Sequence, residues 1–148
     1  MTTIRKGIKS DIPRVLELIK ELADYERALD QVETTIETME RDGFGDNPSY
    51  GFYVAEQDIV VIGVALYYYR YSTWNGRRLY LEDLVVTESA RGTGAGKLLF
   101  DQMISHGKES GCTGMMWQVL DWNESAIAFY QKNDAKIDEG WLNCHLDW

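Results

Sequence analysis

The sequence predicts an α/β protein whose mixed, mostly antiparallel sheet is flanked by helices. The 148 residues suit a single domain with a hydrophobic core, so we expect one domain over residues 1–148. Strand-like and helix-like segments follow each other in the order β-α-α-β-β-β-α-β-α-β. Three strand-like segments in succession with short turns indicate a meander, which excludes a uniform βαβ array.

The first strand is expected at "TIRKGI", near the N-terminus. Ser10 is a candidate N-cap for the helix that follows, and Pro13 falls in its first turn, where proline is tolerated. Thr34 and Glu37 have the spacing of a capping box, which predicts a second short helix. The apolar residues of the first helix recur at helical spacing: Ile12, Val15, Leu16, Ile19, Leu22 and Ala23.

The meander is predicted from "YGFYVAE", "IVVIGVALYYYRY" and "LYLEDLVV". Asn75-Gly76, between the second and third of these segments, is a strong hairpin signal. A helix then runs to about Glu109, followed by a strand at "GMMWQVLDW" and a helix at "NESAIAFYQKN", with Asn123 as its cap. Apolar and polar residues alternate over residues 142–148, which predicts a final half-buried strand.

Charge and composition exclude several classes of protein. A net charge of −9 and a pI near 4.7 argue against a nucleic acid or an anionic membrane surface as partner, but suit a cationic small molecule. No apolar run is long enough to span a membrane, and "MTTIRKGIKSDIPR" lacks a signal core, so we expect a cytoplasmic protein. The cysteines, Cys112 and Cys144, and the histidines, His106 and His145, are too scattered to predict a metal site.

The segment "RGTGAGKLLF", residues 91–100, has glycines at alternate positions before a predicted helix. It is not a P-loop, because residue 91 is arginine and residue 98 is leucine. It is not a dinucleotide-binding loop either, because Lys97 stands where the third glycine would be. A strand, closely spaced backbone N–H groups and a helix start together favour an anion site, to which Arg91 and Lys97 add positive charge, over a tight turn that binds nothing.

The pattern R-G-x-G-x-G between an acidic strand and a helix resembles the acyl-CoA pyrophosphate loop of the GNAT family of N-acetyltransferases. The predicted order of elements resembles that fold over essentially the whole chain. The segments "DGFGDNP", "YSTWNGR", "LYLEDLVV", "VLDWNE" with "FY" downstream, and "EGW" resemble the diamine acetyltransferase branch, which holds thialysine and spermidine/spermine acetyltransferases. The resemblance implies acetyl-CoA as cosubstrate, a small amine as acceptor, no metal, and a homodimer.

The resemblance also implies roles for individual residues. Tyr130 would protonate the departing thiolate, Glu82 would remove the amine proton through water, and Asp83 would bind the acceptor. The residues expected to contact the cofactor are Leu84, Val85, Val86, Arg91, Gly92, Thr93, Gly94, Ala95, Gly96, Lys97, Asn123 and Tyr130. The residues expected to contact the acceptor are Glu26, Trp74, Glu82, Asp83, Glu139 and Trp141.

The residues themselves support part of this chemistry. An alkylammonium with a pKa of about 10.4 must lose its proton before it attacks, and a carboxylate can accept that proton. Glu82 and Asp83 interrupt an apolar strand, where two acids are costly unless they are satisfied or functional. Neighbours on a strand point to opposite faces, so the two acids are expected to differ in role unless a bulge intervenes. Solvation at a strand end remains the alternative.

Other interpretations stay open at this point. Ser72 stands where the spermidine enzymes have aspartate, which favours a thialysine-like or lysine-like acceptor, but a polyamine or a protein lysine is not excluded. A covalent acyltransferase would have to use Cys112 or Cys144, and neither lies in a recognisable catalytic motif. A CoA-binding module without turnover is the alternative outside the enzymes, and Glu82 and Tyr130 argue against it.

Overall fold

The computed structural model describes residues 1–148 and contains a five-stranded sheet in the order β1-β2-β3-β4-β5. The first four strands pair antiparallel, and β5 runs parallel to β4. This mixed α/β architecture confirms the predicted fold class. The strands are β1 (Thr2–Lys6), β2 (Gly51–Gln57), β3 (Val60–Ser72), β4 (Gly76–Val86) and β5 (Gly114–Met116).

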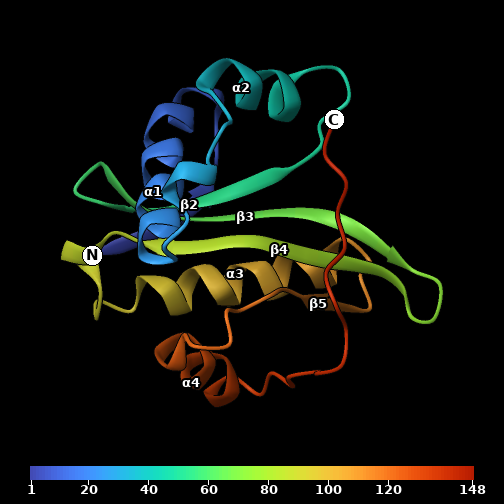
Figure 1. Cartoon of the computed structure of the whole chain (residues 1–148). Helices are drawn as coiled ribbons and strands as arrows, with labels where there is room; N and C mark the ends of the chain where they lie inside the picture. Colours follow the sequence, from blue (N-terminus) through green and yellow to red (C-terminus); the bar gives the residue numbers. More distant parts are fainter. The chain divides into compact units, whose positions relative to one another are not determined.

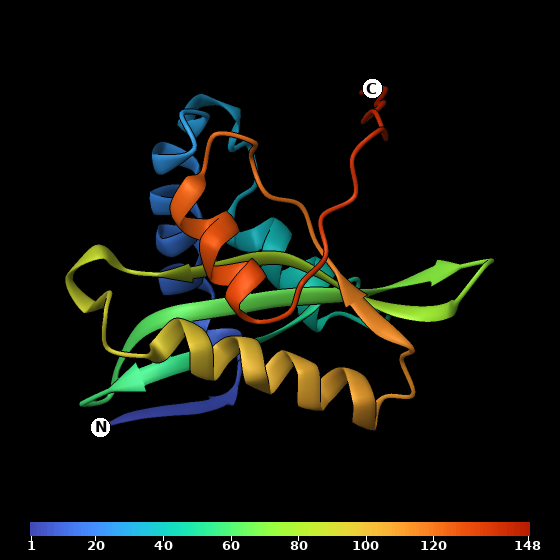
Figure 2. The same ribbon diagram turned by 90° about the horizontal axis from the view of Figure 1, so that it is seen from below.

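The chain forms two compact units, Met1–Gln118 and Val119–Trp148. The first unit holds the whole sheet with α1 (Ile12–Tyr25), α2 (Ile36–Phe44) and α3 (Ala95–Glu109), whereas the second holds α4 (Glu124–Lys132). Within the first unit, α1 and α2 cover one face of the sheet and α3 covers the other (Figure 1). The view from below shows α3 along its own face of the strands (Figure 2). The single domain expected over residues 1–148 stays a prediction.

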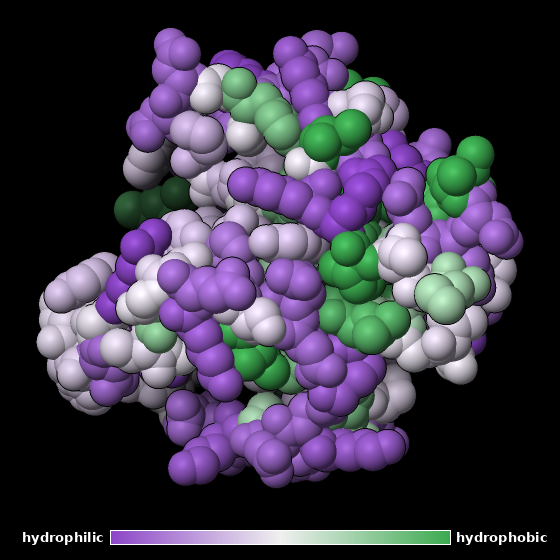
Figure 3. Space-filling view, turned by 180° about the vertical axis from the view of Figure 1, so that it is seen from behind, coloured by the Kyte–Doolittle hydropathy of each residue, from purple (hydrophilic) through white to green (hydrophobic).

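The main hydrophobic core lies between the sheet and the α1/α2 layer. Its largest fully buried side chains include Ile12 and Leu18 of α1 and Phe52 of β2. On the opposite face, Leu99 and Phe100 of α3 are also fully buried. Polar and charged side chains dominate the surface seen in Figure 3, with smaller apolar groups between them, as the charged composition leads one to expect. No helix is both long and apolar enough to cross a bilayer.

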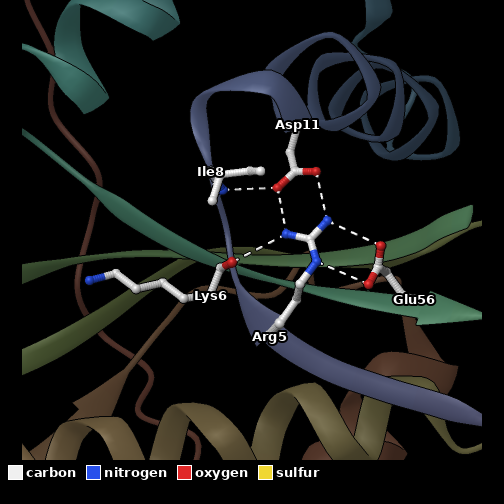
Figure 4. Close-up of polar contacts among 5 residues, drawn as sticks. All are labelled: Arg5, Lys6, Ile8, Asp11 and Glu56. Atoms are coloured by element: carbon white, nitrogen blue, oxygen red, sulfur yellow. Dashed lines mark hydrogen bonds and ion pairs between the residues drawn. The ribbon is translucent and has the colours of Figure 1, made fainter. Parts of the chain in front are cut away.

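An ion-pair network joins the first two strands to the start of α1 (Figure 4). The Arg5 guanidinium donates to both carboxylate oxygens of Asp11, at 2.8 and 2.9 Å, and also contacts Glu56 of β2. Asp11 in turn accepts a hydrogen bond from the Ile8 N–H at 2.9 Å. The hydrogen bonds from Arg5 hold the pKa of the buried Asp11 carboxyl below its usual value.

Two predicted caps differ from the structure. Ser10 does not cap α1, because a short 3-10 turn over Lys9–Asp11 precedes the helix. Asp11 is the N-cap instead, and its carboxylate accepts the hydrogen bond from the Ile8 N–H. In α2 the N-cap is Thr35, whose hydroxyl accepts from the Thr38 N–H at 3.1 Å, one residue beyond the predicted cap. The predicted helix limit at Glu109 and the strand at "LYLEDLVV" are confirmed.

The predicted final strand over residues 142–148 is wrong. No strand forms after β5, and the last residues are exposed, with Leu142 88% and Leu146 86% accessible. Alternation marks a possible strand, but a strand needs a neighbour that accepts its backbone hydrogen bonds. In this structure the segment has no ladder partner. The strand predicted at "GMMWQVLDW" is also shorter, since β5 covers only Gly114–Met116.

Candidate active site

A β-bulge at Glu82 shapes the centre of β4. The β3–β4 register pairs Leu66 with Asp83 and Tyr67 with Leu81, so Glu82 has no partner of its own on β3. A bulge inserts one unpaired residue and re-aims the side chains next to it. In a regular strand Glu82 and Asp83 would point to opposite faces of the sheet. The bulge is the exception that the sequence analysis allowed for, so the two side chains do not point to opposite faces.

Both acids instead point to the face of the sheet covered by α1 and α2. Glu82 accepts a hydrogen bond from the Tyr68 hydroxyl at 3.0 Å, and Tyr68 follows Leu66 on the same face of β3. Asp83 lies opposite Leu66, which belongs to the core beneath α1. The bulge thus brings two neighbouring carboxylates to one face.

The environment of Asp83 favours its neutral form. Burial, followed by the negative charges of Glu82 and Glu26, raises the pKa of Asp83 to about 7. Glu26, at the end of α1, has a pKa that is itself raised by burial. Three acids therefore gather in one region of the first unit, and the raised pKa of Asp83 favours its protonated form. A bound cation would favour the charged form of each acid.

Beside these acids, one edge of β4 is open. The β4–β5 ladder has only three residue pairs and ends where Tyr80 meets Met116. From Leu81 to Val86, β4 continues without a partner on that side. The two strands therefore separate beyond this pair, which leaves backbone groups of β4 without a ladder partner along the edge.

The register identifies which backbone groups face this edge. The Thr87 N–H donates to the Ile62 carbonyl at 2.8 Å. Hydrogen-bonded and non-hydrogen-bonded pairs alternate along an antiparallel ladder. Counting back from Thr87, Val85 directs its N–H and C=O to β3, whereas Leu84 and Val86 direct theirs to the open edge. Of the three backbones predicted to contact a cofactor, two therefore face the edge.

The glycine loop that follows β4 leads directly into α3. Gly92 and Gly94 have φ values of +80° and +88°, and a Cβ at either would have nothing within 4 Å. Positive φ, rather than close packing, is therefore the reason for glycine here. Gly94 is the N-cap of α3 and offers no side-chain acceptor, so the first N–H groups of the helix stay available to an external anion.

The charged residues of this loop have partners within the first unit. Arg91 donates from Nε to the Val86 carbonyl at 3.2 Å, and its guanidinium lies 3.9 Å from Glu21 of α1. Glu21 also accepts from the Thr87 hydroxyl and from the Glu88 N–H, at 2.9 and 2.8 Å. Lys97 pairs with Asp101 one turn along α3. Glu21 was not identified from the sequence, because only the fold brings α1 against this loop.

The structure does not bring Trp74 to Glu82 within one chain. Trp74 is 85% exposed at the tip of the β3–β4 hairpin, about 20 Å along β4 from Glu82 at about 3.3 Å per residue. Ser72 stabilises the same turn, because its hydroxyl accepts from the Trp74 and Asn75 N–H groups at 3.2 and 3.1 Å. Ser72 is therefore a turn residue at the hairpin tip.

Four predicted site residues belong to the second unit. Asn123 is buried and caps α4, since its side chain accepts from the Ala126 N–H at 3.3 Å, as the sequence indicated. Tyr130 lies in the second turn of α4 and is half-buried. Glu139 and Trp141 lie in the exposed segment after α4. The roles of these four residues stay predictions.

Sequence reasoning also missed Tyr68 and Tyr80. Their rings stack across β3 and β4 with centroids 5.2 Å apart. Burial, followed by the charge of Glu82, raises the pKa of both hydroxyls, so both stay protonated as donors at neutral pH. The run of tyrosines at residues 67–69 was a signal, but its alternation between faces became informative only with the register. No group of acids, cysteines and histidines is arranged to hold a metal ion.

Comparison with known proteins defines the class to which this fold and site belong. The model of the acetyltransferase (GNAT) family matches residues 15–134. An aminoglycoside acetyltransferase from an uncultured soil metagenomic sample has a similar structure, with a TM-score of 0.80 at 17% identity over 99% of this chain and 96% of that one. The chain belongs to the GNAT family of acetyltransferases.

Curated relatives narrow the similarity further. The thialysine N-epsilon-acetyltransferase of Mus musculus is 37% identical, over 99% of this chain and 92% of its own. The enzyme of the same name from Bos taurus is 39% identical, over 93% of this chain and 88% of its own. The human spermidine/spermine N(1)-acetyltransferase-like protein 1 is 36% identical over 93% of this chain, which corresponds to 21% of that protein. These names confirm the predicted branch of the family.

Proposed function

We propose that this protein transfers acetyl from acetyl-CoA to the primary amine of a small cationic acceptor, by direct attack in a ternary complex. One observation carries the proposal: the bulge in β4 places Glu82 and Asp83 together, beside the edge that β5 leaves open. The names of the relatives favour a thialysine-like or lysine-like acceptor over a polyamine.

The cosubstrate would supply an activated acetyl thioester. Its pyrophosphate fits the glycine loop, where Gly92 and Gly94 allow close approach and α3 offers uncapped N–H groups. Arg91 and Lys97 would add positive charge, while Thr93, Ala95 and Gly96 complete the loop. The outward N–H groups of Leu84 and Val86 fit the extended arm and the thioester oxygen. Val85, which lies between Leu84 and Val86, would also line the cofactor site. Asn123 would contact the cofactor from the next loop.

The acceptor must lose a proton before it attacks. In this proposal Glu82 accepts that proton through water, with its orientation held by the Tyr68 hydroxyl. Asp83 and Glu26 provide the negative charge that attracts a cationic amine. Asp83 would become ionised as the cation binds, because an opposite charge favours the carboxylate.

Tyr130 would supply the remaining step. The Tyr130 hydroxyl would give its proton to the departing thiolate, as the "FY" motif of the family implies, since a phenol with a pKa of about 10 is a suitable donor. Glu139 and Trp141 would complete the acceptor site. Because Trp74 lies far from Glu82 in its own chain, a homodimer in which the hairpin serves another copy is part of the proposal.

The proposal is tested by following thiol release from acetyl-CoA with thialysine, lysine, putrescine, spermidine, spermine and a lysine peptide. Turnover with a small amine, highest for thialysine, is the expected result. Preference for spermidine would favour the polyamine alternative. CoA binding without turnover on any amine would contradict the proposal and leave a CoA-binding module.

A further inference from the structure

Two arginines face each other across β3 and β4 without a carboxylate partner. Arg70 and Arg78 are direct register partners, so their side chains leave the sheet on the same face. Neither takes part in any of the ion pairs that the structure contains. The one hydrogen bond that Arg70 donates goes to the Met116 sulfur, a weak acceptor, at 3.6 Å.

This arrangement is unfavourable in the free protein. Like charges directly opposite on a sheet repel each other, and guanidinium groups lose hydration where they pack on neighbours. Arg78 is partly buried against β5, where its guanidinium fills the space that a Cβ on Gly114 would need. The chain carries 24 acidic residues, yet none forms an ion pair with either arginine. An anion that bridged both guanidiniums would relieve the repulsion.

The pair lies on the same face as the acids of the candidate active site. The Arg70 guanidinium is 6.0 Å from the centroid of the Tyr80 ring, so it leans along the sheet toward Glu82. From the other side, Glu82 reaches Tyr68, which stacks on Tyr80. Arg70 and Glu82 have opposite effects on the pKa of the Tyr80 hydroxyl between them, since Arg70 lowers it and Glu82 raises it.

We infer that Arg70 and Arg78 bind a carboxylate of the acceptor, so that the enzyme selects amino-acid amines over simple diamines. This inference rests on the proposed function. The acceptor's ammonium would lie at Glu82 and Asp83, its chain along the stacked rings of Tyr68 and Tyr80, and its carboxylate at the arginines. Arg78 and Glu82 are four residues apart on β4, or about 13 Å between Cα atoms, and both side chains extend into that interval.

The test compares thialysine with thialysine amide, which differ only in the carboxylate, and identifies the acetylated nitrogen by mass spectrometry. The wild-type protein is expected to have a kcat/KM at least about tenfold higher for thialysine than for thialysine amide, because the carboxylate forms charged hydrogen bonds to the arginines. The difference should lie mainly in KM. Arg70→Gln and Arg78→Gln should each remove most of this preference while leaving the amide rate unchanged. Arg70→Lys should retain part of it.

Arg77→Gln is the matched control. Arg77 neighbours Arg78 on β4 but stacks on Tyr69, with its guanidinium 3.9 Å from the ring, on the side of α3. This variant loses the same charge and should keep the preference. Equal wild-type rates for acid and amide would overturn the inference but leave the proposed function intact. Loss of both rates in Arg70→Gln, together with a changed oligomeric state, would also overturn it. Absence of turnover on any amine would contradict the proposed function itself.

Discussion

Glu82 and Asp83 are sequence neighbours whose side chains lie on one face of the sheet, because Glu82 is the extra residue of a β-bulge. A regular strand would have sent one of them into the α3 layer. The bulge also lies beside the point where β5 leaves β4. The acids and the open edge therefore occur together, and three of the following predictions concern these acids and the glycine loop that follows β4.

Glu82→Gln should lower kcat at pH 7 by about 10²- to 10⁴-fold, because the amide cannot accept the proton of the ammonium. The loss should shrink as the pH approaches 10, where the acceptor loses its proton unaided. A pH–rate profile from 6.5 to 10 measures this, with Glu37→Gln on the exposed first turn of α2 as control. A pH-independent loss would contradict the proton-acceptor role.

Asp83→Asn should make the protein more stable at pH 8 and leave its stability almost unchanged at pH 4. The pKa of Asp83 is raised in the folded state, so its contribution is favourable below its unfolded value and is lost as pH rises toward about 7. The gain at pH 8 should be at most about 4 kcal/mol, because the pKa of Asp83 rises from its ordinary value to about 7. Urea unfolding at several pH values measures the difference, and a constant difference would contradict the raised pKa.

Gly94→Ala should destabilise the protein by about 1–2 kcal/mol and raise the KM for acetyl-CoA. The cause is its φ of +88°, which L-residues other than glycine avoid, and not a clash, because the position is open. Gly96→Ala is the control for stability, since its Cβ would make only ordinary contact with Val86 at 3.8 Å. Equal destabilisation of the two variants in thermal unfolding would show that φ is not the cause.

Asp11→Asn should cost about 2 kcal/mol of stability at pH 7, because it breaks charged hydrogen bonds to Arg5 and Ile8. The pKa of Asp11 is lowered in the folded state, so its contribution is present above its unfolded value and is lost as pH falls. The difference from wild type should therefore shrink below about pH 4. Asp58→Asn, in the exposed turn between β2 and β3, is a suitable control.

Tyr130→Phe should lower kcat by about 10²-fold or more and leave the affinity for CoA and the thermal stability nearly unchanged. The substitution keeps the ring in place and removes only the hydroxyl. Calorimetric titration with CoA, together with steady-state rates, separates binding from turnover. Full activity in the variant would exclude the hydroxyl as the proton donor.

Much of the fold was predictable from local patterns. β-rich segments located the central strands, helical spacing located α1, and Asn75-Gly76 located the hairpin. The glycine loop was predictable in the same way, because positive φ is a local backbone requirement. Local signals failed where the structure of a segment depended on a contact with a distant part of the chain. Residues 142–148 alternate as a strand does but lack a ladder partner, and the cap of α1 was decided by Arg5, which holds Asp11 from β1.

The sequence by itself determined the family, the order of the elements as far as α4 and the candidate acids Glu82 and Asp83, because motifs and periodicities are local properties of the chain. Only the tertiary structure decided that both acids share a face, that Tyr68 holds Glu82, and that Arg70 and Arg78 lie opposite each other. These relations depend on strand register, and a single unpaired residue changes the face to which its neighbours point. Register results from long-range pairing, which no short segment of the sequence specifies.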